Sequence, residues 1–218
     1  MLSISKQTIL KVFFICCIGV PYLNNYELTF LVWGLTAILT IQRFYSVRFL
    51  SQIVCYGFVL TFSFIPSLYN EFKWYDYIRD ITYLIKPIIG LFLGYQLCRK
   101  FEGNPIKIII STGVLLAFVH LLVVFFGYFY RGYSNIHEIR AFSGFFSDYE
   151  VYVIIIVLFH NHFGVALSYK LRAIYSVVLI ASSLLYLSRT NIIQFFILYI
   201  ALKGYFEFNK RNLIGLLS

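Results

Sequence analysis

The sequence predicts an all-α fold: a polytopic integral membrane helical bundle of about eight transmembrane helices, followed by the start of a ninth. Of the 218 residues, 61% are hydrophobic and only 12% are charged, and the mean hydropathy is +0.82. Soluble domains carry roughly 25% charged residues. The apolar residues also gather in runs close to the length that crosses a bilayer, with short polar stretches between them. We therefore expect lipid to surround most of these side chains.

The first half of the chain contains four predicted spans. Lys6 and Lys11 precede the first apolar run, and Pro21 closes it, with no A-x-A-like cleavage site after it. We interpret this run as an uncleaved membrane helix rather than a signal peptide. A polar loop, Asn70–Asp80, precedes the fourth span, which Lys86-Pro87 interrupts. These spans are Thr8–Leu23, Glu27–Gln42, Phe49–Leu68 and Ile81–Cys98.

The second half contains four more spans and a final polar turn. A polar loop, Arg131–Ser147, separates the fifth span from the sixth. Residues Asn212–Ser218 read as the first turns of another helix, so we expect a single transmembrane domain, 1–218, from the N-terminal part of a longer protein. A short interfacial stub is the alternative for this tail. These spans are Ile106–Tyr130, Tyr149–Leu167, Ala173–Leu187 and Asn191–Lys203.

The basic residues predict the orientation of these spans. With the N-terminus in the cytoplasm, the inner side holds Lys6, Lys11, Arg43, Arg48, Arg99, Lys100, Lys107, Lys170, Arg172, Lys203, Lys210 and Arg211. The outer side then holds only Lys73, Arg79, Arg131, Arg140 and Arg189. This asymmetry satisfies the positive-inside rule. The net charge of +9 is thus spread over small groups between apolar runs, which does not favour a nucleic-acid-binding face.

Cysteine and histidine residues do not predict a metal site. The four cysteines have no C-x-x-C spacing and are interpreted as small apolar residues: Cys16, Cys17, Cys55 and Cys98. The histidines of the predicted spans are interpreted as core or interfacial residues: His120, His160 and His162. We also find no glycine-rich phosphate loop and no nucleophile motif. We therefore expect no metal and no cofactor.

Two outer segments combine residues that suit an anionic ligand. The loop after the fifth span carries Arg131, His137 and Arg140, and a guanidinium fork matches a phosphate or diphosphate. A solvated loop with partly neutralised charges is the alternative. Ser188-Arg189-Thr190 stands at the outer junction of the last two spans, where a charged residue is a functional candidate by default. Snorkelling of Arg189 to lipid headgroups is the alternative there.

Lys86 is a third candidate, because it lies several residues inside the fourth span and directly before Pro87. A lysine within a membrane usually has a partner or faces a water-filled cavity, and proline frees backbone carbonyls beside it. Lys86 could therefore contact a substrate. The alternative is that the helix starts after Lys86 and leaves this residue at the interface.

The outer segments resemble a known family. Arg140-x-x-x-Gly144-Phe-Phe before a membrane helix, followed by a helix that ends in Ser188-Arg189-Thr190, resembles the O-antigen polymerase and O-antigen ligase superfamily, most clearly over Ile136–Leu202. The resemblance implies a multi-pass protein of the bacterial inner (cytoplasmic) membrane. Such proteins transfer glycan from undecaprenyl diphosphate to an acceptor at the outer face, by metal-independent glycosyl transfer.

The resemblance also implies roles for individual residues. Arg140 and Arg189 would be the catalytic arginines that hold the diphosphate leaving group, and Arg79 with Gly90 would match an R-x10-G pattern of polymerases. Polymerases extend the repeats of O-antigen or capsule, whereas ligases attach the glycan to the lipid A core, and we favour the polymerase. The residues expected to bind substrate are Arg79, Lys86, Arg131, His137, Ser188 and Thr190.

The chain departs from this family in two respects. Relatives often carry Pro-Asn shortly after the glycine, where this chain has Ser147-Asp148-Tyr149. The large outer loop that should carry the catalytic base is also missing, so an inactive fragment is one expectation. Base candidates within the chain are Glu138, Asp148 and Glu150, since a carboxylate could deprotonate an acceptor hydroxyl.

Two other classes of function remain as alternatives. A transporter or lipid flippase could use Lys86 and Arg189 along a pathway, although the inverted repeats typical of transporters are not found. The chain could also be a non-catalytic subunit of a polysaccharide-export assembly. The expected partners are an undecaprenyl-diphosphate-linked oligosaccharide, the lipid bilayer, and chain-length regulator and flippase proteins, with no nucleic acid.

Overall fold

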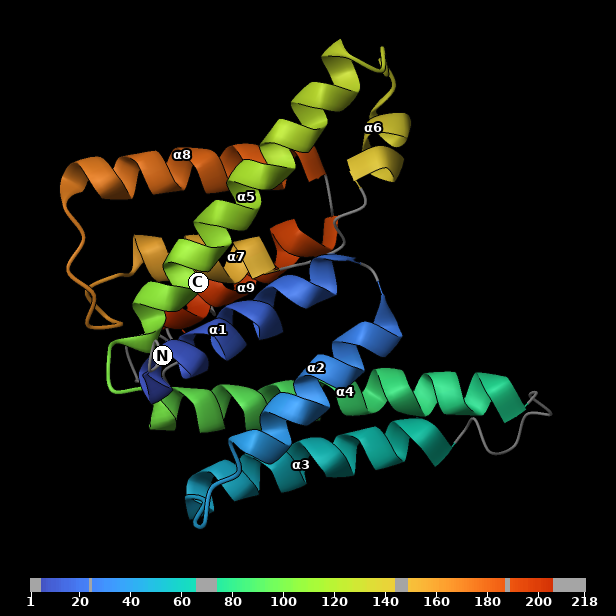
Figure 1. Ribbon diagram of the computed structural model, residues 1–218, viewed down its shortest axis with the longest axis vertical. Helices are drawn as coiled ribbons and strands as arrows, with labels where there is room; N and C mark the ends of the chain where they lie inside the picture. Colours follow the sequence, from blue (N-terminus) through green and yellow to red (C-terminus); the bar gives the residue numbers. More distant parts are fainter. Residues whose placement is uncertain (1–4, 24, 66–73, 144–148, 187–188, 206–218) are drawn as a thin grey trace, which may run out of the picture. The chain divides into compact units, whose positions relative to one another are not determined.

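The computed structural model describes residues 5–23, 25–65, 74–143, 149–186 and 189–205. These residues form helices joined by turns, with no β-strand among them (Figure 1). The prediction of an all-α fold is confirmed for this part of the chain. The chain divides into two compact units, which are described separately. Unit 1 comprises Met1–Cys17 and Tyr26–Gly103, and unit 2 comprises Ile18–Asn25 and Asn104–Ser218.

Three helical segments are long and apolar enough to cross a membrane, which indicates a membrane protein. They are Lys6–Leu23, Asp80–Lys100 and Pro105–Phe129, with 18, 21 and 25 residues. Four other apolar helices have only 10–17 residues: Tyr26–Leu39, Val47–Phe62, Tyr149–Leu158 and Thr190–Leu202. A perpendicular span usually needs about 20 residues. Helix length therefore does not confirm eight spans, and that number stays a prediction.

Unit 1 is built around a long helix, α4, against which two shorter helices pack. α1 (Lys6–Gly19) continues into a 3-10 turn, η1 (Val20–Leu23), and is followed by α2 (Tyr26–Leu39), α3 (Val47–Phe64) and α4 (Trp74–Lys100). α2 and α3 both contact α4. α3 begins where the sequence supplies a cap, because the Ser46 hydroxyl accepts a hydrogen bond from the Phe49 N–H (3.2 Å).

α4 differs from its predicted span in two ways. It begins at Trp74 instead of Ile81, so part of the predicted loop Asn70–Asp80 is helical. It also runs unbroken through Pro87, and the alternative that a helix starts after Lys86 is wrong. Pro87 removes one helical N–H and with it the helical partner of the carbonyl four residues earlier, but continuing the helix keeps the remaining backbone groups paired, as apolar surroundings require.

Buried polar side chains tie the connection between α2 and α3 to α4. The Thr40 hydroxyl donates to Oε1 of Gln96 (2.9 Å), and Nε2 of Gln96 donates to the Tyr45 hydroxyl (2.7 Å). Nε2 of Gln42 donates to the Gln96 carbonyl oxygen (3.3 Å). Thr40 and Gln96 are both almost completely buried. A single glutamine on α4 thus satisfies several groups that would otherwise be left unpaired in unit 1.

Unit 2 packs three helices against α5 and a fourth against α7. Its elements are α5 (Pro105–Phe129), α6 (Ile136–Ser143), α7 (Tyr149–Leu158), α8 (Tyr169–Tyr186) and α9 (Arg189–Leu202). α5 contacts α6, α7 and α8, and α7 contacts α8 and α9 (Figure 1). The core cluster of buried apolar side chains comes mainly from α5, α7 and α8: Ile110, Ala117, Val153, Ile154, Val157, Val165 and Leu179.

α5 agrees closely with its predicted span, because local signals mark both of its ends. The Asn104 side chain accepts a hydrogen bond from the Ile106 N–H (2.9 Å), and Pro105 occupies the first helical position. At the other end the Tyr130 N–H still donates to the Phe126 carbonyl (2.9 Å). Gly132 then turns the chain with a φ of 71°, a conformation that glycine adopts without strain.

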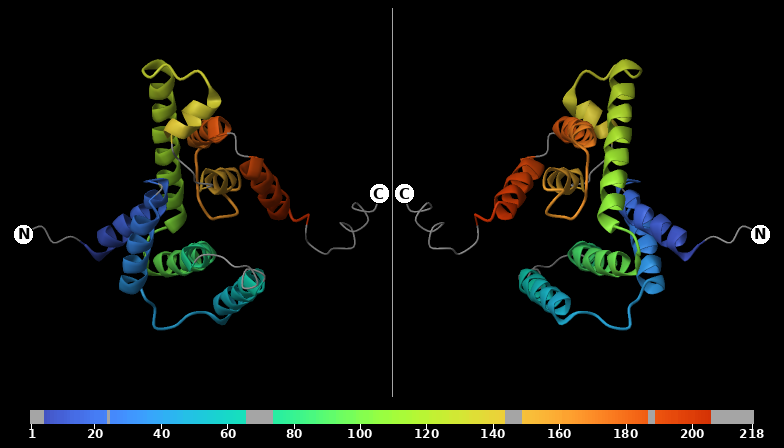
Figure 2. Two further views of the ribbon diagram at one scale, coloured as in Figure 1. Left: turned by 90° about the vertical axis from the view of Figure 1, so that its right-hand side faces the viewer. Right: turned by 90° about the vertical axis from the view of Figure 1, so that its left-hand side faces the viewer.

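The predicted loop Arg131–Ser147 contains a helix, α6. Oδ1 of Asn135 accepts a hydrogen bond from the His137 N–H (3.0 Å) and so caps the start of α6. Figure 2 shows α6 folded back beside the end of α5. The two helices meet at a glycine: a Cβ added at Gly127 would lie 3.0 Å from Cδ1 of Phe142.

α7 is shorter than its predicted span, because it ends at Leu158 and not at Leu167. A turn follows, in which Gly164 has a φ of 64°. The Val165 N–H donates to the His160 carbonyl (2.9 Å), and Nδ1 of His160 lies 2.8 Å from the Val165 carbonyl oxygen. This closed turn pairs backbone groups that a continuing helix would have paired, so the apolar sequence after Leu158 leaves the helix without orphaned groups.

We predict that Gly113→Ala destabilises unit 2. A Cβ at Gly113 would lie 2.5 Å and 3.0 Å from the two Cγ atoms of Val153, which is completely buried and β-branched and therefore cannot move aside easily. Overpacking of this kind costs about 1–3 kcal/mol. Thermal unfolding in detergent should show a lower midpoint for this variant.

Gly94→Ala on α4 is the matched control, because no atom lies within 4 Å of an added Cβ there. This helical substitution should leave the midpoint unchanged or raise it slightly. Equal midpoints for the two variants would contradict the close contact of α5 with α7.

Candidate functional site

Arg140 lies in the last turn of α6, and its side chain is half-buried. α6 is a short helix that packs on α5 through Phe142, and this packing supports Arg140. Arg131 and His137, by contrast, are exposed. The segment that was expected to be a solvated loop therefore holds one of its cations in an ordered, partly desolvated place, where a guanidinium interacts more strongly with an anion than it does in bulk water.

The second predicted arginine, Arg189, is the first residue of α9. Its side chain lies outside the described part of the structure, as do Ser188, Asp148 and the side chain of Arg79. Thr190 is described and exposed. The first turn of a helix presents unpaired backbone N–H groups and favours anions. The start of α9 therefore combines a helix N-terminus with an arginine in the sequence.

The predicted site residues fall into two groups. Arg140 and Arg189 belong to unit 2, together with Arg131, His137 and Thr190. Arg79 and Lys86 lie on α4 in unit 1. The structure therefore associates the two predicted catalytic arginines with one unit, and the candidate site is built from unit 2.

Lys86 has partners within unit 1. Its Nζ lies 5.5 Å from the centroid of the Tyr26 ring and 5.9 Å from that of the Trp33 ring, so both rings of α2 attract the ammonium group. Trp33 is held by a hydrogen bond from its Nε1 to the Cys17 carbonyl (2.9 Å). This aromatic environment explains how α4 carries a lysine in the middle of an apolar span.

Gly90, the partner of Arg79 in the R-x10-G pattern, packs against the Trp33 ring. A Cβ at Gly90 would lie 3.7 Å from the nearest ring atom, which is an ordinary van der Waals distance. An alanine would fit at this position. The packing of unit 1 therefore gives no steric reason for glycine there.

Three polar side chains from three helices of unit 2 form a buried hydrogen-bonded chain. The Ser182 hydroxyl of α8 donates to Oε1 of Glu150 on α7 (2.8 Å) and lies 2.7 Å from Nδ1 of His120 on α5. The exposed fractions are 5% for Glu150, 0% for Ser182 and 1% for His120. We call this the Glu150–Ser182–His120 chain.

The order of the groups in this chain is not that of a nucleophilic triad. In a Ser-His-Asp triad the histidine lies between the other two groups and removes the serine proton. Here the serine lies in the middle and donates a hydrogen bond to the carboxyl group. Burial of all three side chains also keeps a large glycan away from Glu150. Glu150, one of the predicted base candidates, is thus sequestered inside the helix bundle.

Sequence reasoning missed this chain, because it interpreted His120 only as a core or interfacial residue. One signal was present: His120 lies seven residues after Gly113, with Ala117 between them, which puts all three on one face of α5. Small residues along a helix face mark a close helix contact. A histidine on such a face has to find a partner on the neighbouring helix.

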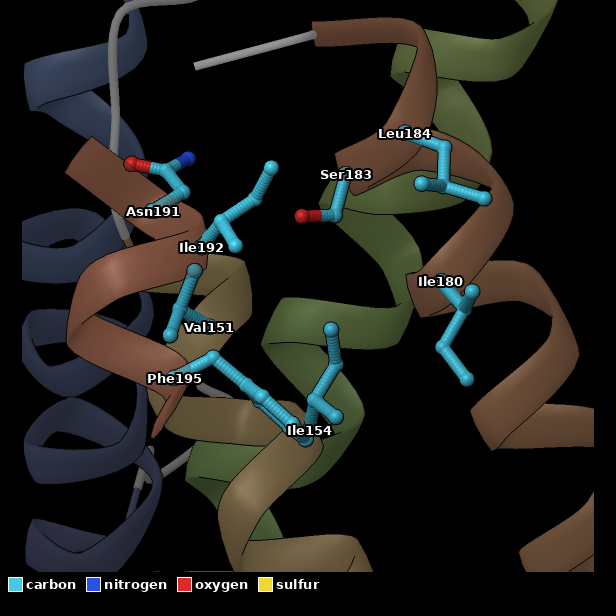
Figure 3. Close-up of a pocket in the computed structure, with 8 residues that line it drawn as sticks. All are labelled: Val151, Ile154, Ile180, Ser183, Leu184, Asn191, Ile192 and Phe195. Carbon is cyan, nitrogen blue, oxygen red and sulfur yellow. The ribbon is translucent and has the colours of Figure 1, made fainter. Parts of the chain in front are cut away.

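A pocket of about 240 Å³ lies between α7, α8 and α9 (Figure 3). Most of its lining is apolar, and Figure 3 shows the Ser183 hydroxyl directed into the space between α8 and α9. Asn191, in the first turn of α9, lies at the same pocket. The lining residues are Val151, Ile154, Ile180, Ser183, Leu184, Asn191, Ile192 and Phe195.

Two amide oxygens on α9 are buried and have no hydrogen-bond partner among the described residues, namely Oδ1 of Asn191 and Oε1 of Gln194. Asn191 is only 4% exposed. These residues are three apart, so they lie on adjacent turns of one helix face. An unpaired buried acceptor costs about 1–3 kcal/mol. The start of α9 therefore has unused capacity for a ligand that carries hydroxyl or amide donors.

A metal centre is not apparent: no group of three or more His, Cys, Asp or Glu that could hold a metal ion occurs among the residues that the structure describes. The candidate site consists of the pocket and the start of α9, and Arg140 on α6 belongs to the same unit.

Comparison with known proteins identifies no relative. No protein-family model matches the sequence, and no curated protein or solved structure is significantly similar to it.

We predict that Asn191→Leu stabilises the ligand-free protein. Leucine has nearly the same size as asparagine and removes an acceptor that is buried without a partner, so the folded state should gain about 1 kcal/mol. The measurement is the thermal unfolding midpoint in detergent.

The control is Asn161→Leu in the exposed turn after α7, which should not raise the midpoint. A lower midpoint for Asn191→Leu would show that the Asn191 amide makes a stabilising interaction and would remove the reason for a polar ligand site at this position.

Proposed function

We propose that this protein is a multi-pass protein of the bacterial cytoplasmic membrane, with eight spans and its N-terminus inside, that polymerises surface glycan. Its substrates would be undecaprenyl-diphosphate-linked oligosaccharide repeats of O-antigen or capsular polysaccharide, joined at the outer face. The reaction is glycosyl transfer: the acceptor hydroxyl attacks the anomeric carbon, and the bond from that carbon to the diphosphate oxygen breaks. The acceptor proton passes to a base, and the lipid diphosphate leaves.

One observation carries this proposal: an apolar pocket adjoins the helix start that bears Arg189. The pocket walls are mainly Val, Ile, Leu and Phe side chains, which suit a hydrocarbon chain. The first turn of α9 supplies backbone N–H groups and an arginine, which suit a diphosphate. A polyprenyl diphosphate has a matching structure, with a charged head next to an apolar tail.

The size of the pocket limits what it could hold. Ligand pockets for small molecules usually measure about 300–1,000 Å³, whereas this pocket measures about 240 Å³. It would therefore accept only the part of the lipid tail nearest the diphosphate, and the rest of the tail would lie in the bilayer.

Arg140 would act on the leaving group as the second cation. Cleavage of a sugar–diphosphate bond develops negative charge on the leaving phosphate, and a fixed cation directed at that charge stabilises the transition state. Arg140 belongs to the same unit as Arg189, and α6 holds it half-buried. A base for the acceptor hydroxyl is not assigned, because Glu150 is buried and Glu138 is exposed on α6.

Membrane transport is the second candidate. Intramembrane polar residues frequently mark an ion or substrate pathway, and the Glu150–Ser182–His120 chain is such a group. A flippase would move the lipid-linked sugar across the bilayer without changing its covalent structure. The glycan products therefore separate the two functions.

We predict that Arg140→Lys and Arg189→Lys each shorten the surface glycan in a strain that depends on this protein for it. Lysine keeps the charge but loses the two-pronged donor geometry. Loss of one transition-state donor reduces turnover on the order of 100-fold, so most chains should stop at one or a few repeats on a silver-stained glycan gel.

Arg172→Lys at the start of α8 is the control, since it lies on the predicted inner side and should leave chain length unchanged. Lipid-linked repeats that accumulate at the outer face would support the polymerase. Full-length chains that are no longer attached to the lipid A core would indicate a ligase, and repeats trapped at the inner face would indicate a flippase. Unaltered glycan in both variants would overturn the proposal.

A further inference from the structure

The Glu150–Ser182–His120 chain lies among apolar side chains in unit 2. Its neighbours along the helices include Ala117 on α5, Val151 and Val153 on α7, and Leu179 on α8, all at most 1% exposed. A carboxyl group in such surroundings cannot rely on water to stabilise a charge. Any charge on Glu150 therefore has to be balanced within the protein.

No ion pair with Glu150 occurs among the described residues. On α5 and α8, the lysine and arginine residues lie far along the helix axes from the chain. Lys107 precedes His120 by 13 residues on α5, and Arg172 precedes Ser182 by 10 on α8, which correspond to about 20 Å and 15 Å. His120 is thus the titratable group that the hydrogen bonds connect to Glu150.

The other titratable and charged groups on these helices lie outside this hydrogen-bonded chain. The Tyr149 hydroxyl donates to the Ile109 carbonyl (3.1 Å), and Tyr152 is exposed. On α6, His137 and Glu138 are exposed and Arg140 is half-buried. The remaining groups on the helices packed around the chain are Tyr128 on α5, Tyr169, Lys170, Tyr175 and Tyr186 on α8, and Arg189 and Tyr199 on α9. The side chains of Tyr186 and Arg189 lie outside the described part of the structure.

The hydrogen-bond geometry allows two arrangements of protons. A hydroxyl has one proton to donate. When Ser182 donates to Glu150, Nδ1 of His120 must carry a proton and donate to the Ser182 oxygen. When Glu150 carries a proton and donates to Ser182, the serine proton turns to Nδ1 of His120, which must then be an acceptor. The two distances of 2.8 Å and 2.7 Å suit both arrangements.

We infer that the Glu150–Ser182–His120 chain is a proton-binding site that holds one shared proton and passes it between α7 and α5 through the Ser182 hydroxyl. In the transfer, the Glu150 O–H bond breaks as its proton moves to Oγ of Ser182, and the proton of Ser182 moves to Nδ1 of His120. A neutral acid and imidazole become a carboxylate and an imidazolium. The total charge of the chain stays zero throughout.

Removal of the shared proton would leave one net negative charge in the interior of unit 2, which the apolar surroundings disfavour. The apolar surroundings therefore favour the form of the chain that holds the shared proton. This inference does not depend on the proposed glycan chemistry, because it concerns side chains that are closed off from the pocket lining.

Infrared spectroscopy of the whole chain in phospholipid nanodiscs tests the bound proton. With glutamate labelled by ¹³C at the side-chain carboxyl, the wild type should show a protonated carboxylic acid band at neutral pH that carries the isotope shift. Glu150→Gln should lack this band. Glu138→Gln, which changes an exposed glutamate on α6, should keep it. A wild-type spectrum with only carboxylate bands at neutral pH would overturn the inference.

Nitrogen NMR of the histidine rings tests the transfer. The chain has four histidines, and His120→Asn assigns the relevant signal. His120 of the wild type should exchange between imidazole and imidazolium, whereas Ser182→Ala should fix it in one form because the relay is cut. A single, pH-independent form in the wild type would overturn the relay. This wild-type measurement decides the question even if Ser182→Ala does not fold.

Discussion

The organisation of unit 2 depends on the close approach of α5 to α7 at Gly113. Any side chain at this position would collide with Val153, so the distance between the two helices is set by the lack of one. The same face of α5 continues with buried residues at helical spacing: Ala117, His120, Val124 and Gly127. In apolar surroundings, where burial from water cannot drive helix association, such close packing is the main source of helix–helix attraction.

The other features of unit 2 follow from this face. Two turns after Gly113, it brings His120 within hydrogen-bonding distance of Ser182 on α8. Two further turns along, Gly127 leaves room for the Phe142 ring and so supports the helix that carries Arg140. A bulky residue at either glycine would therefore disturb a polar contact as well as the packing. The polar chain and the candidate cation are positioned by the same surface.

Local signals explain which parts of the fold could be predicted from sequence. α5 was predicted nearly residue by residue, because Asn104-Pro105 caps its start and Gly132 turns the chain after its end. Hydropathy could not foresee that α7 ends at Leu158, since apolar residues resume after the short polar stretch His160–His162 and hydrogen bonds close this stretch into a turn. It also could not foresee α6, whose polar sequence forms a helix because Asn135 caps it and Phe142 finds a contact on α5. Hydropathy scales describe the transfer of single residues from water to lipid, and they contain no information on the partners that a residue contacts in the fold.

The candidate site shows the same division. Arginines next to apolar runs were visible in the sequence, and the residues Arg140 and Arg189 fall in one unit. The pocket was not visible, because it arises from the packing of α7, α8 and α9. Glu150 was expected to face the outer solution, but burial against Ser182 gives it a different environment. Which acidic residue becomes buried depends on how the helices pack, and the positions of charged residues in the sequence do not predict this packing.

The unequal lengths of neighbouring helices in unit 2 have a consequence for the surrounding lipid. α5, with 25 residues, is about 37 Å long, whereas α7, with 10 residues, is about 15 Å long. A hydrocarbon layer of about 30 Å matches the first helix and exceeds the second. Most of α7 is buried among α5, α8 and α9, so the lipid around unit 2 meets these three helices more than it meets α7. The hydrophobic length that the bilayer has to match is therefore set by the outer helices, and α7 can stay short without thinning the bilayer.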